Sequence, residues 1–153
     1  MVRTTDNPRE CKDAKQALVL VKAWQTERVA SQLKKCLAED GLAVTLQNGL
    51  GNYETLDNIL RQAQDGPARV ALGATTTGAT LLGPGLVRAG GEGVISIERH
   101  QAIGPMEEAL KSARFNVQLV HDAQSLIWGK LVINAAINPL TALLGVPNGE
   151  LLE

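Results

Sequence analysis

The sequence predicts an α/β protein built around a largely parallel sheet. Two short runs of β-prone apolar residues, 17–21 and 42–46, flank a segment whose apolar residues have helical spacing. A second helical segment follows, and this strand–helix–strand–helix order is typical of βαβ units on a parallel sheet. After residue 69 the pattern changes to short strands separated by glycine turns.

In the first half, the polar residues 1–16 are expected to form a loop, and residues 17–21 a strand buried on both faces. Thr26 is expected to cap the next helix, which would end at the Asp40–Gly41 pair. Residues 42–46 are the second expected strand. A second helix is expected over about residues 52–64, before the turn residues Asp65, Gly66 and Pro67.

The second half is expected to begin with a strand over residues 69–77. Short strands within residues 86–97, joined by glycine turns, are expected to extend the sheet in antiparallel fashion. Pro105 suits the first turn of a helix, and a last strand covers residues 117–120. From residue 123 the pattern is helical until Pro139 closes it, with a kinked continuation over residues 140–144.

The composition narrows the classes of function. With 153 residues, 44% of them apolar, the chain is long enough for one packed domain. Its net charge of −1 argues against a nucleic-acid module. No apolar run approaches the roughly 20 residues of a membrane span, and no signal-peptide pattern is evident. Cys11 and Cys36 have no zinc-ligand spacing, so we expect a cytoplasmic protein without metal, nucleic-acid or membrane partners.

Two segments end predicted parallel strands with polar residues: 22–25 (KAWQ) and 47–51 (QNGLG). Ligands of open parallel sheets bind beyond the carboxyl ends of strands. Gly49 and Gly51 permit a tight turn and close approach of the backbone to a ligand. The alternative is an ordinary strand-to-helix turn, since Asn-Gly is a common turn dipeptide. The sequence contains no GxGxxG and no phosphate-binding Walker loop.

A polar stripe is predicted on the helix after residue 123. Lys130, Asn134 and Asn138 are spaced i, i+4, i+8 and would form a stripe about 12 Å long, with apolar residues between them. This pattern favours the polar wall of a cleft, and the alternative is a narrow solvent-facing stripe. A lysine in a partly desolvated cleft can act as a general acid.

Six segments resemble ketopantoate reductase (2-dehydropantoate 2-reductase). They are residues 20–25 (LVKAWQ), 47–51 (QNGLG), 73–77 (GATTT), 128–134 (WGKLVIN), 138–142 (NPLTA) and 147–151 (PNGEL). The resemblance covers nearly all of the chain from residue 17 to residue 151. One NGxG segment would be a weak signal, but six in this order and spacing are specific.

The resemblance implies NADPH-dependent reduction of 2-dehydropantoate to pantoate, in the pathway to pantothenate and coenzyme A. It implies that residues 1–121 are the C-terminal part of a Rossmann-type NADP-binding domain. Residues 122–153 would then begin an all-α substrate domain, with the boundary near His121–Asp122.

The resemblance also implies a role for particular residues. Lys130 is similar in position to the general acid that protonates the ketone oxygen. The residues implied to bind substrate are Asn134, Asn138 and Asn148, and those implied to line the NADPH site are Lys22, Gln25, Asn48 and Ala79.

Compared with the family pattern, this sequence lacks the first strand, the glycine-rich loop and most of the helical domain. It is therefore expected to be an internal fragment that binds NADPH weakly on its own, because the pyrophosphate would lack its helix N-terminus. The alternatives are a non-catalytic truncated remnant or a related 2-keto acid reductase. An exposed sheet edge would favour a homo-oligomer.

Overall fold

A five-stranded mixed sheet forms the centre of the computed structural model, which describes residues 4–61 and 69–152. The strand order is β1-β2-β3-β6-β7. The first three strands are parallel to one another: β1 (Ala14–Val19), β2 (Leu37–Thr45) and β3 (Val70–Thr75). β6 (Val94–Glu98) runs antiparallel to β3 and parallel to β7 (Asn116–Val120). The predicted α/β class is confirmed.

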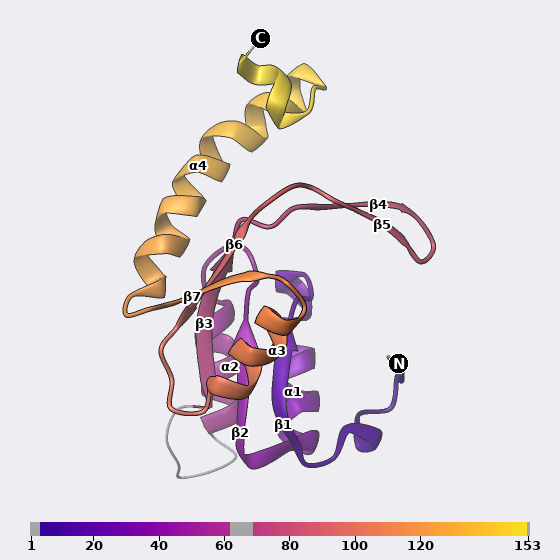
Figure 1. The fold of residues 1–153 in the computed structure, drawn as a ribbon, viewed down its shortest axis with the longest axis vertical. Coiled ribbons are helices and arrows are strands. Elements are labelled where there is room, and N and C mark those ends of the chain that lie inside the picture. Colours follow the sequence, from indigo (N-terminus) through magenta and orange to yellow (C-terminus); the bar gives the residue numbers. More distant parts are fainter. Residues whose placement is uncertain (1–3, 62–68, 153) are drawn as a thin grey trace.

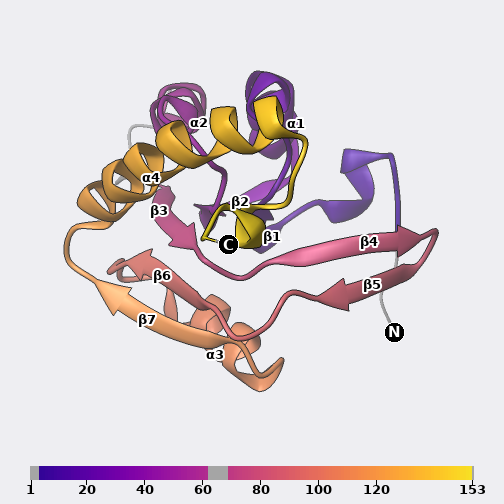
Figure 2. The same cartoon turned by 90° about the horizontal axis from the view of Figure 1, so that it is seen from above.

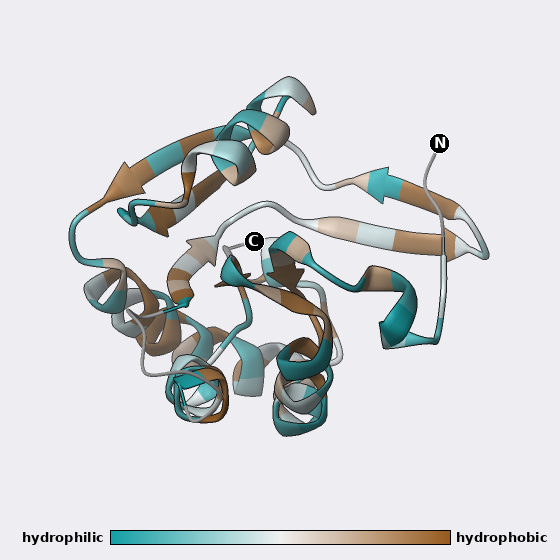
Figure 3. Ribbon diagram, turned by 90° about the horizontal axis from the view of Figure 1, so that it is seen from below, coloured by the Kyte–Doolittle hydropathy of each residue, from teal (hydrophilic) through white to brown (hydrophobic). Residues whose placement is uncertain are grey.

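Helices cover both faces of this sheet. α1 (Thr26–Cys36) and α2 (Asn52–Arg61) lie on one face, and α3 (Gly104–Ser112) lies on the other (Figure 2). The strands are largely hydrophobic, whereas the covering helices carry both hydrophobic and hydrophilic residues (Figure 3). The sheet is therefore the middle layer of three.

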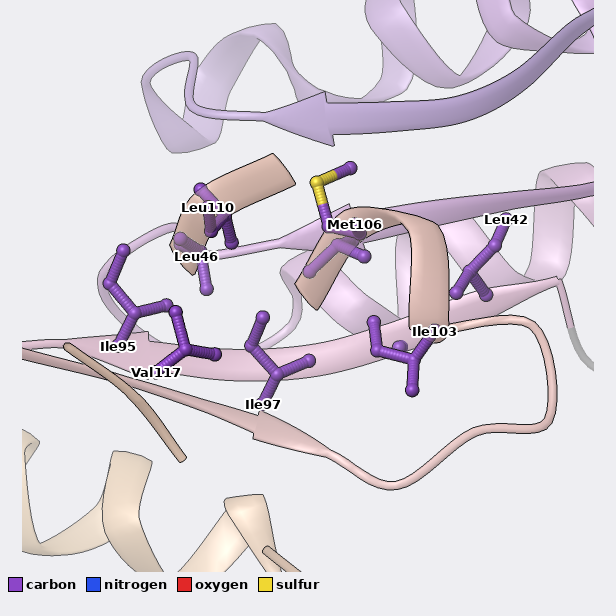
Figure 4. Packing of buried hydrophobic residues seen from close by; sticks show 10 residues of the cluster. Leu42, Leu46, Ile95, Ile97, Ile103, Met106, Leu110 and Val117 are labelled. Atoms are coloured by element: carbon purple, nitrogen blue, oxygen red, sulfur yellow. The ribbon is translucent and has the colours of Figure 1, made fainter. Parts of the chain in front are cut away.

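The core has two parts, one on each face of the sheet. Under α3, Met106 and Leu110 pack over strand residues such as Ile97 (Figure 4). Between the other face of the sheet and the helices α1 and α2, Leu56 and Leu60 of α2 are fully buried. Burial on both faces explains why β2 has a continuous apolar run rather than an alternating pattern.

The limits of the first elements differ from the prediction. β1 begins at Ala14, after a 3₁₀ turn over Pro8–Cys11, so the expected loop over residues 1–16 is wrong in its last part. Thr26 is the first residue of α1 rather than its cap. The helix ends at Cys36, before the Asp40–Gly41 pair that was expected to end it. Of the second predicted helix, residues 62–64 lie outside the described part of the chain.

The Asp40–Gly41 pair instead lies within β2, where the pairing with β1 shifts in register. Such an irregularity leaves backbone groups without ladder partners. Arg69 Nε donates to the carbonyl oxygen of Gly41 at 3.3 Å, and its guanidinium also donates to the Ala38 carbonyl. A buried arginine thus satisfies the carbonyls of the bulge, and the turn-forming residues mark this bulge rather than a helix end.

β4 (Ala79–Gly83) and β5 (Leu86–Ala89) form a separate antiparallel hairpin, which projects away from the main sheet (Figure 1). The expected antiparallel extension of the sheet is thus right for β6 but wrong for residues 86–89. The base of the hairpin is closed by backbone hydrogen bonds from Gly90 N to Gly78 O, at 2.8 Å, and from Thr76 N to Val94 O, at 2.9 Å.

α4 (Ala123–Leu144) is one continuous helix of 22 residues, and it rises past the upper ends of the strands (Figure 1). Pro139 was expected to close the helix, but it lies inside it. Proline removes one backbone donor, and the Thr141 hydroxyl donates to the carbonyls of Ile137 and Asn138 in the same turn. A 3₁₀ turn, η3 (Asn148–Leu152), follows.

By length and composition, α4 is long and apolar enough to cross a membrane, and it is the one such helix among residues 4–61 and 69–152. This differs from the expectation that no segment resembles a membrane span. One such helix is weak evidence for a membrane span, because the mostly buried core helices of soluble proteins meet the same criteria; in α4, 6% of the apolar 18-residue window is buried. Lys130, Asn134 and Asn138 interrupt the apolar surface of α4.

Candidate functional site

The candidate site lies where the carboxyl ends of β2 and β3 meet α4. Parallel strands end at the same edge of a sheet, and this edge is the usual ligand position in open α/β folds. Two turns leave the sheet there: residues 22–25 after β1, and residues 48–51 after β2. α4 packs against β3 and provides the third wall.

The turn after β1 contains a short 3₁₀ segment, Ala23–Gln25, that leads into α1. Gln25 Oε1 accepts from Lys22 N at 3.2 Å, and Gln25 N donates to Lys22 O at 2.8 Å. The Lys22 side chain is exposed, and so is Trp24, at 80%. This turn therefore presents a cation and an indole at the sheet edge.

The turn after β2 is built on two glycines in the left-handed region. Gly49 has φ 88° and Gly51 has φ 84°, which other residues rarely adopt. A Cβ at either position would meet no atom within 4 Å, so the backbone of this turn has open space beside it. The predicted tight turn is confirmed, and Asn48 is exposed at its start.

A small pocket lies between this turn and α4, with a cavity volume of about 10 Å³, roughly the room of one water molecule. Its polar lining comes from Lys130 and Asn134 on α4 and from Gln47 and Asn48 after β2. The apolar lining residues are Ala74, Ile127 and Leu131. The pocket thus combines an ammonium group with side-chain amides on an apolar floor.

Lys130 is partly buried in this pocket. Its Nζ donates to the carbonyl oxygen of Thr75, at the end of β3, at 2.5 Å. Desolvation by burial holds the pKa of Lys130 below its ordinary value. A lysine with a lowered pKa gives up its proton more readily than a lysine with the ordinary value.

The structure brings together three of the eight residues singled out from the sequence: Asn48, Lys130 and Asn134. Lys22, Gln25, Ala79, Asn138 and Asn148 are not among the residues lining this pocket. Ala79 lies on the projecting hairpin, and Asn148 lies in η3 beyond the end of α4. Of the predicted stripe on α4, Asn138 is exposed while Lys130 and Asn134 are partly buried, so both interpretations of the stripe hold in part.

Sequence reasoning missed the buried polar side chains behind the two turns, of which Gln47 is central. It also missed the Thr75 carbonyl as a partner for Lys130. Asn52, the first residue of α2, was one available signal, because a polar residue following a glycine turn at a helix start often makes local hydrogen bonds.

The sheet, the strand-end turns and the pocket together define a Rossmann-like α/β domain followed by a helix. A family model described as "Ketopantoate reductase PanE/ApbA" matches residues 2–102, and one described as "Ketopantoate reductase PanE/ApbA C terminal" matches residues 122–153. The chain belongs to the ketopantoate reductase PanE/ApbA family, which confirms the resemblance.

Curated relatives and solved structures support the same family. The chain is 38% identical to the 2-dehydropantoate 2-reductase of Archaeoglobus fulgidus over 146 residues, covering 92% of this chain and 47% of that protein. It is 34% identical to the enzyme of that name from Halobacterium salinarum, covering 96% and 48%. A PanE/ApbA family ketopantoate reductase from Ralstonia eutropha matches with a TM-score of 0.82 and 29% identity, covering 97% and 48%. The chain spans about half the length of these relatives.

Proposed function

We propose that this chain forms part of an NADPH-dependent 2-dehydropantoate 2-reductase, acting in the cytoplasm on the route to pantothenate and coenzyme A. The observation that carries the proposal is the pocket that Lys130, Asn48 and Asn134 line together. The names of the curated relatives support the substrate and the reaction. In this proposal residues 1–121 belong to the cofactor domain, and residues 122–153 begin the substrate domain.

The turn after β2 fits the nicotinamide end of a dinucleotide. Its backbone has open space at Gly49 and Gly51, where a side chain would otherwise fill the approach. Asn48 at this turn, Lys22 and Gln25 at the neighbouring turn, and the backbone of Ala79 would hold the cofactor. The bound cofactor would supply the hydride that is transferred to the carbonyl carbon of the substrate.

Lys130 would donate the proton to the ketone oxygen as negative charge develops there. The carbonyl of Thr75 positions its Nζ, and burial lowers its pKa, so proton transfer and charge stabilisation come from one group. Asn134, Asn138 and Asn148 would bind the carboxylate and hydroxyl of the substrate through their amide groups. The amine left on Lys130 then regains a proton from solvent.

Turnover can be measured in a chimera in which this chain replaces the matching segment of the Archaeoglobus fulgidus relative. Loss of NADPH absorbance at 340 nm should depend on 2-dehydropantoate. Lys130→Ala should lower kcat by about 10²- to 10⁴-fold with little change in the KM for NADPH, because it removes a proton donor. The same assay on the purified chain alone measures how much activity the chain itself supports.

Val132→Ala is the matched control, since Val132 lies on the same helix and is 65% exposed. Equal losses of kcat and NADPH affinity in Lys130→Ala would contradict the acid role. Faster reduction of another 2-keto acid would favour a related reductase. A folded chimera without turnover would favour the non-catalytic remnant.

A further inference from the structure

Four polar side chains are buried behind the two turns at the sheet edge. Thr26, Thr45, Gln47 and Asn52 are exposed by 2%, 1%, 8% and 6%. Burying polar groups costs free energy unless they are hydrogen-bonded. No buried atom of these four side chains lacks a partner within the described part of the chain. We call these four residues the polar network.

Gln47 is the centre of the polar network. Its Nε2 donates to Val21 O at 2.8 Å and to Thr26 Oγ1 at 2.9 Å, so both amide hydrogens are used. Its Oε1 accepts from the Thr45 hydroxyl at 3.1 Å. Val21 precedes the first turn, so Gln47 ties the start of that turn to the end of β2.

The polar network continues to the second turn. Thr26 Oγ1 donates to Asn52 Oδ1 at 2.9 Å, and Asn52 Nδ2 donates to the backbone oxygen of Asn48 at 3.1 Å. Thr26 is thus both acceptor and donor, and its hydroxyl links α1 to the start of α2. The bonds run without interruption from Val21 O, beside Lys22, to Asn48 O.

We propose that Thr26 and Gln47 are positioning residues of the site: their side chains fix turn 22–25 relative to turn 48–51, and so place Asn48 opposite Lys130. The functional part of this inference rests on the proposed reductase. Apolar residues could fill the same positions without needing partners, whereas only hydrogen bonds fix direction and register between two turns. Gln47 itself lines the pocket with Lys130.

The test compares Thr26→Val, which removes the hydroxyl at nearly constant volume, with Thr26→Ser, which keeps it. Thr80→Val makes the same chemical change on the exposed hairpin. In ¹⁵N relaxation of the purified chain, Thr26→Val should lower the order parameters of Asn48 and Gly49 and shift the amide signals of Lys22 and Gln25. Thr26→Ser and Thr80→Val should resemble the wild type. If Thr26→Val lowers stability but leaves both turns unchanged, the positioning role is overturned.

Gln47→Met provides a second route if Thr26→Val does not fold. It removes the bonds to Val21 and Thr26 while the Thr26–Asn52 bond can persist. It should loosen the same two turns, and unchanged relaxation at both turns would overturn the proposal.

In the chimera, Thr26→Val should raise the KM for NADPH by about tenfold, as expected for loss of one or two hydrogen bonds that position a binding group, and Thr26→Ser should restore it. Unchanged kinetics beside loosened turns would overturn the functional part of the inference. A wild-type chimera without turnover would count against the proposed reductase, and the relaxation data would still decide whether the polar network positions the turns.

Discussion

Lys130 places a positive charge where the fold disfavours it. The helix brings its side chain against the end of β3, where Thr75 O is its hydrogen-bond partner and Ala74, Ile127 and Leu131 form the apolar part of the pocket lining. Burial stabilises the neutral amine relative to the ammonium, and this lowers the pKa. The same environment that suits a general acid therefore makes stability depend on pH.

The sign of that dependence follows from proton binding. Between the lowered pKa of the folded chain and the ordinary value of 10.5, the unfolded chain binds more protons at Lys130 than the folded chain does. The free energy of unfolding should therefore rise with pH through this window, relative to Lys130→Met. Urea unfolding of both proteins at several pH values from neutral towards 10.5 measures the difference, in which contributions of other groups cancel. A flat or falling difference would show that the folded pKa is not lowered.

The position of a single site residue could be predicted from the sequence where helical spacing alone determines it. Asn134 lies one helical turn after Lys130, so their shared pocket follows from the helix. The bonds from Thr26 to Gln47 and Asn52 could not be predicted, because they join residues 21 and 26 positions apart in sequence. Such contacts depend on how the turns meet in space.

Among the elements, α2 illustrates how packing decides stability. Leu56 of α2 is fully buried, whereas Leu143 near the end of α4 is 84% exposed. Leu56→Ala should lower the free energy of unfolding by about 2–5 kcal/mol, through lost burial and the cavity left behind. Leu143→Ala should change it by less than about 0.5 kcal/mol. Urea denaturation with unchanged m-values would measure both, and similar costs at the two positions would contradict this packing.

The boundary between α1 and β2 shows why element limits are harder to predict than element types. Asp40 and Gly41 are typical helix-ending residues, and a helix end was expected there for that reason. Their actual place in a bulge depends on Arg69, which lies about thirty residues later and supplies the donors for the bulge carbonyls. A local pattern contains no information on such a distant partner.

Within residues 4–61 and 69–152, both the β4–β5 hairpin and α4 carry large apolar side chains that lie outside the core. On the hairpin, Leu81 lies opposite Val87 in the pairing, and these side chains are 72% and 60% exposed. On α4, Leu144 is 65% exposed. Exposed apolar surface of this kind favours association, and β1 at the edge of the main sheet adds unpaired backbone groups.

We therefore expect the isolated chain to associate as its concentration rises. Sedimentation velocity over a concentration series should show a growing sedimentation coefficient. Leu81→Lys should reduce this growth by placing a charge on the apolar face of the hairpin, while Thr80→Lys, on the neighbouring position of the same strand, should reduce it less. Equal effects of the two substitutions would mean that net charge rather than the apolar face controls association.

The class of the whole fold could be predicted because strand and helix periodicities are local. The strand order could not, because β3 pairs with β6 across an intervening hairpin. Nothing in residues 86–89 distinguishes a strand of the main sheet from one arm of a separate hairpin, since both are short and β-prone.

The closed base of the β4–β5 hairpin has a further consequence. Chain leaving β3 and chain entering β6 are joined by backbone hydrogen bonds at Gly78–Gly90 and Thr76–Val94, so the segment between them begins and ends at nearly one place. Its strands pair with each other and with no strand of the main sheet. Loops whose ends already meet tolerate exchange at little cost in closure entropy. The base of the hairpin is therefore a suitable replacement site. A reporter peptide or a foreign loop could replace the hairpin there without breaking a hydrogen bond between strands of the five-stranded sheet.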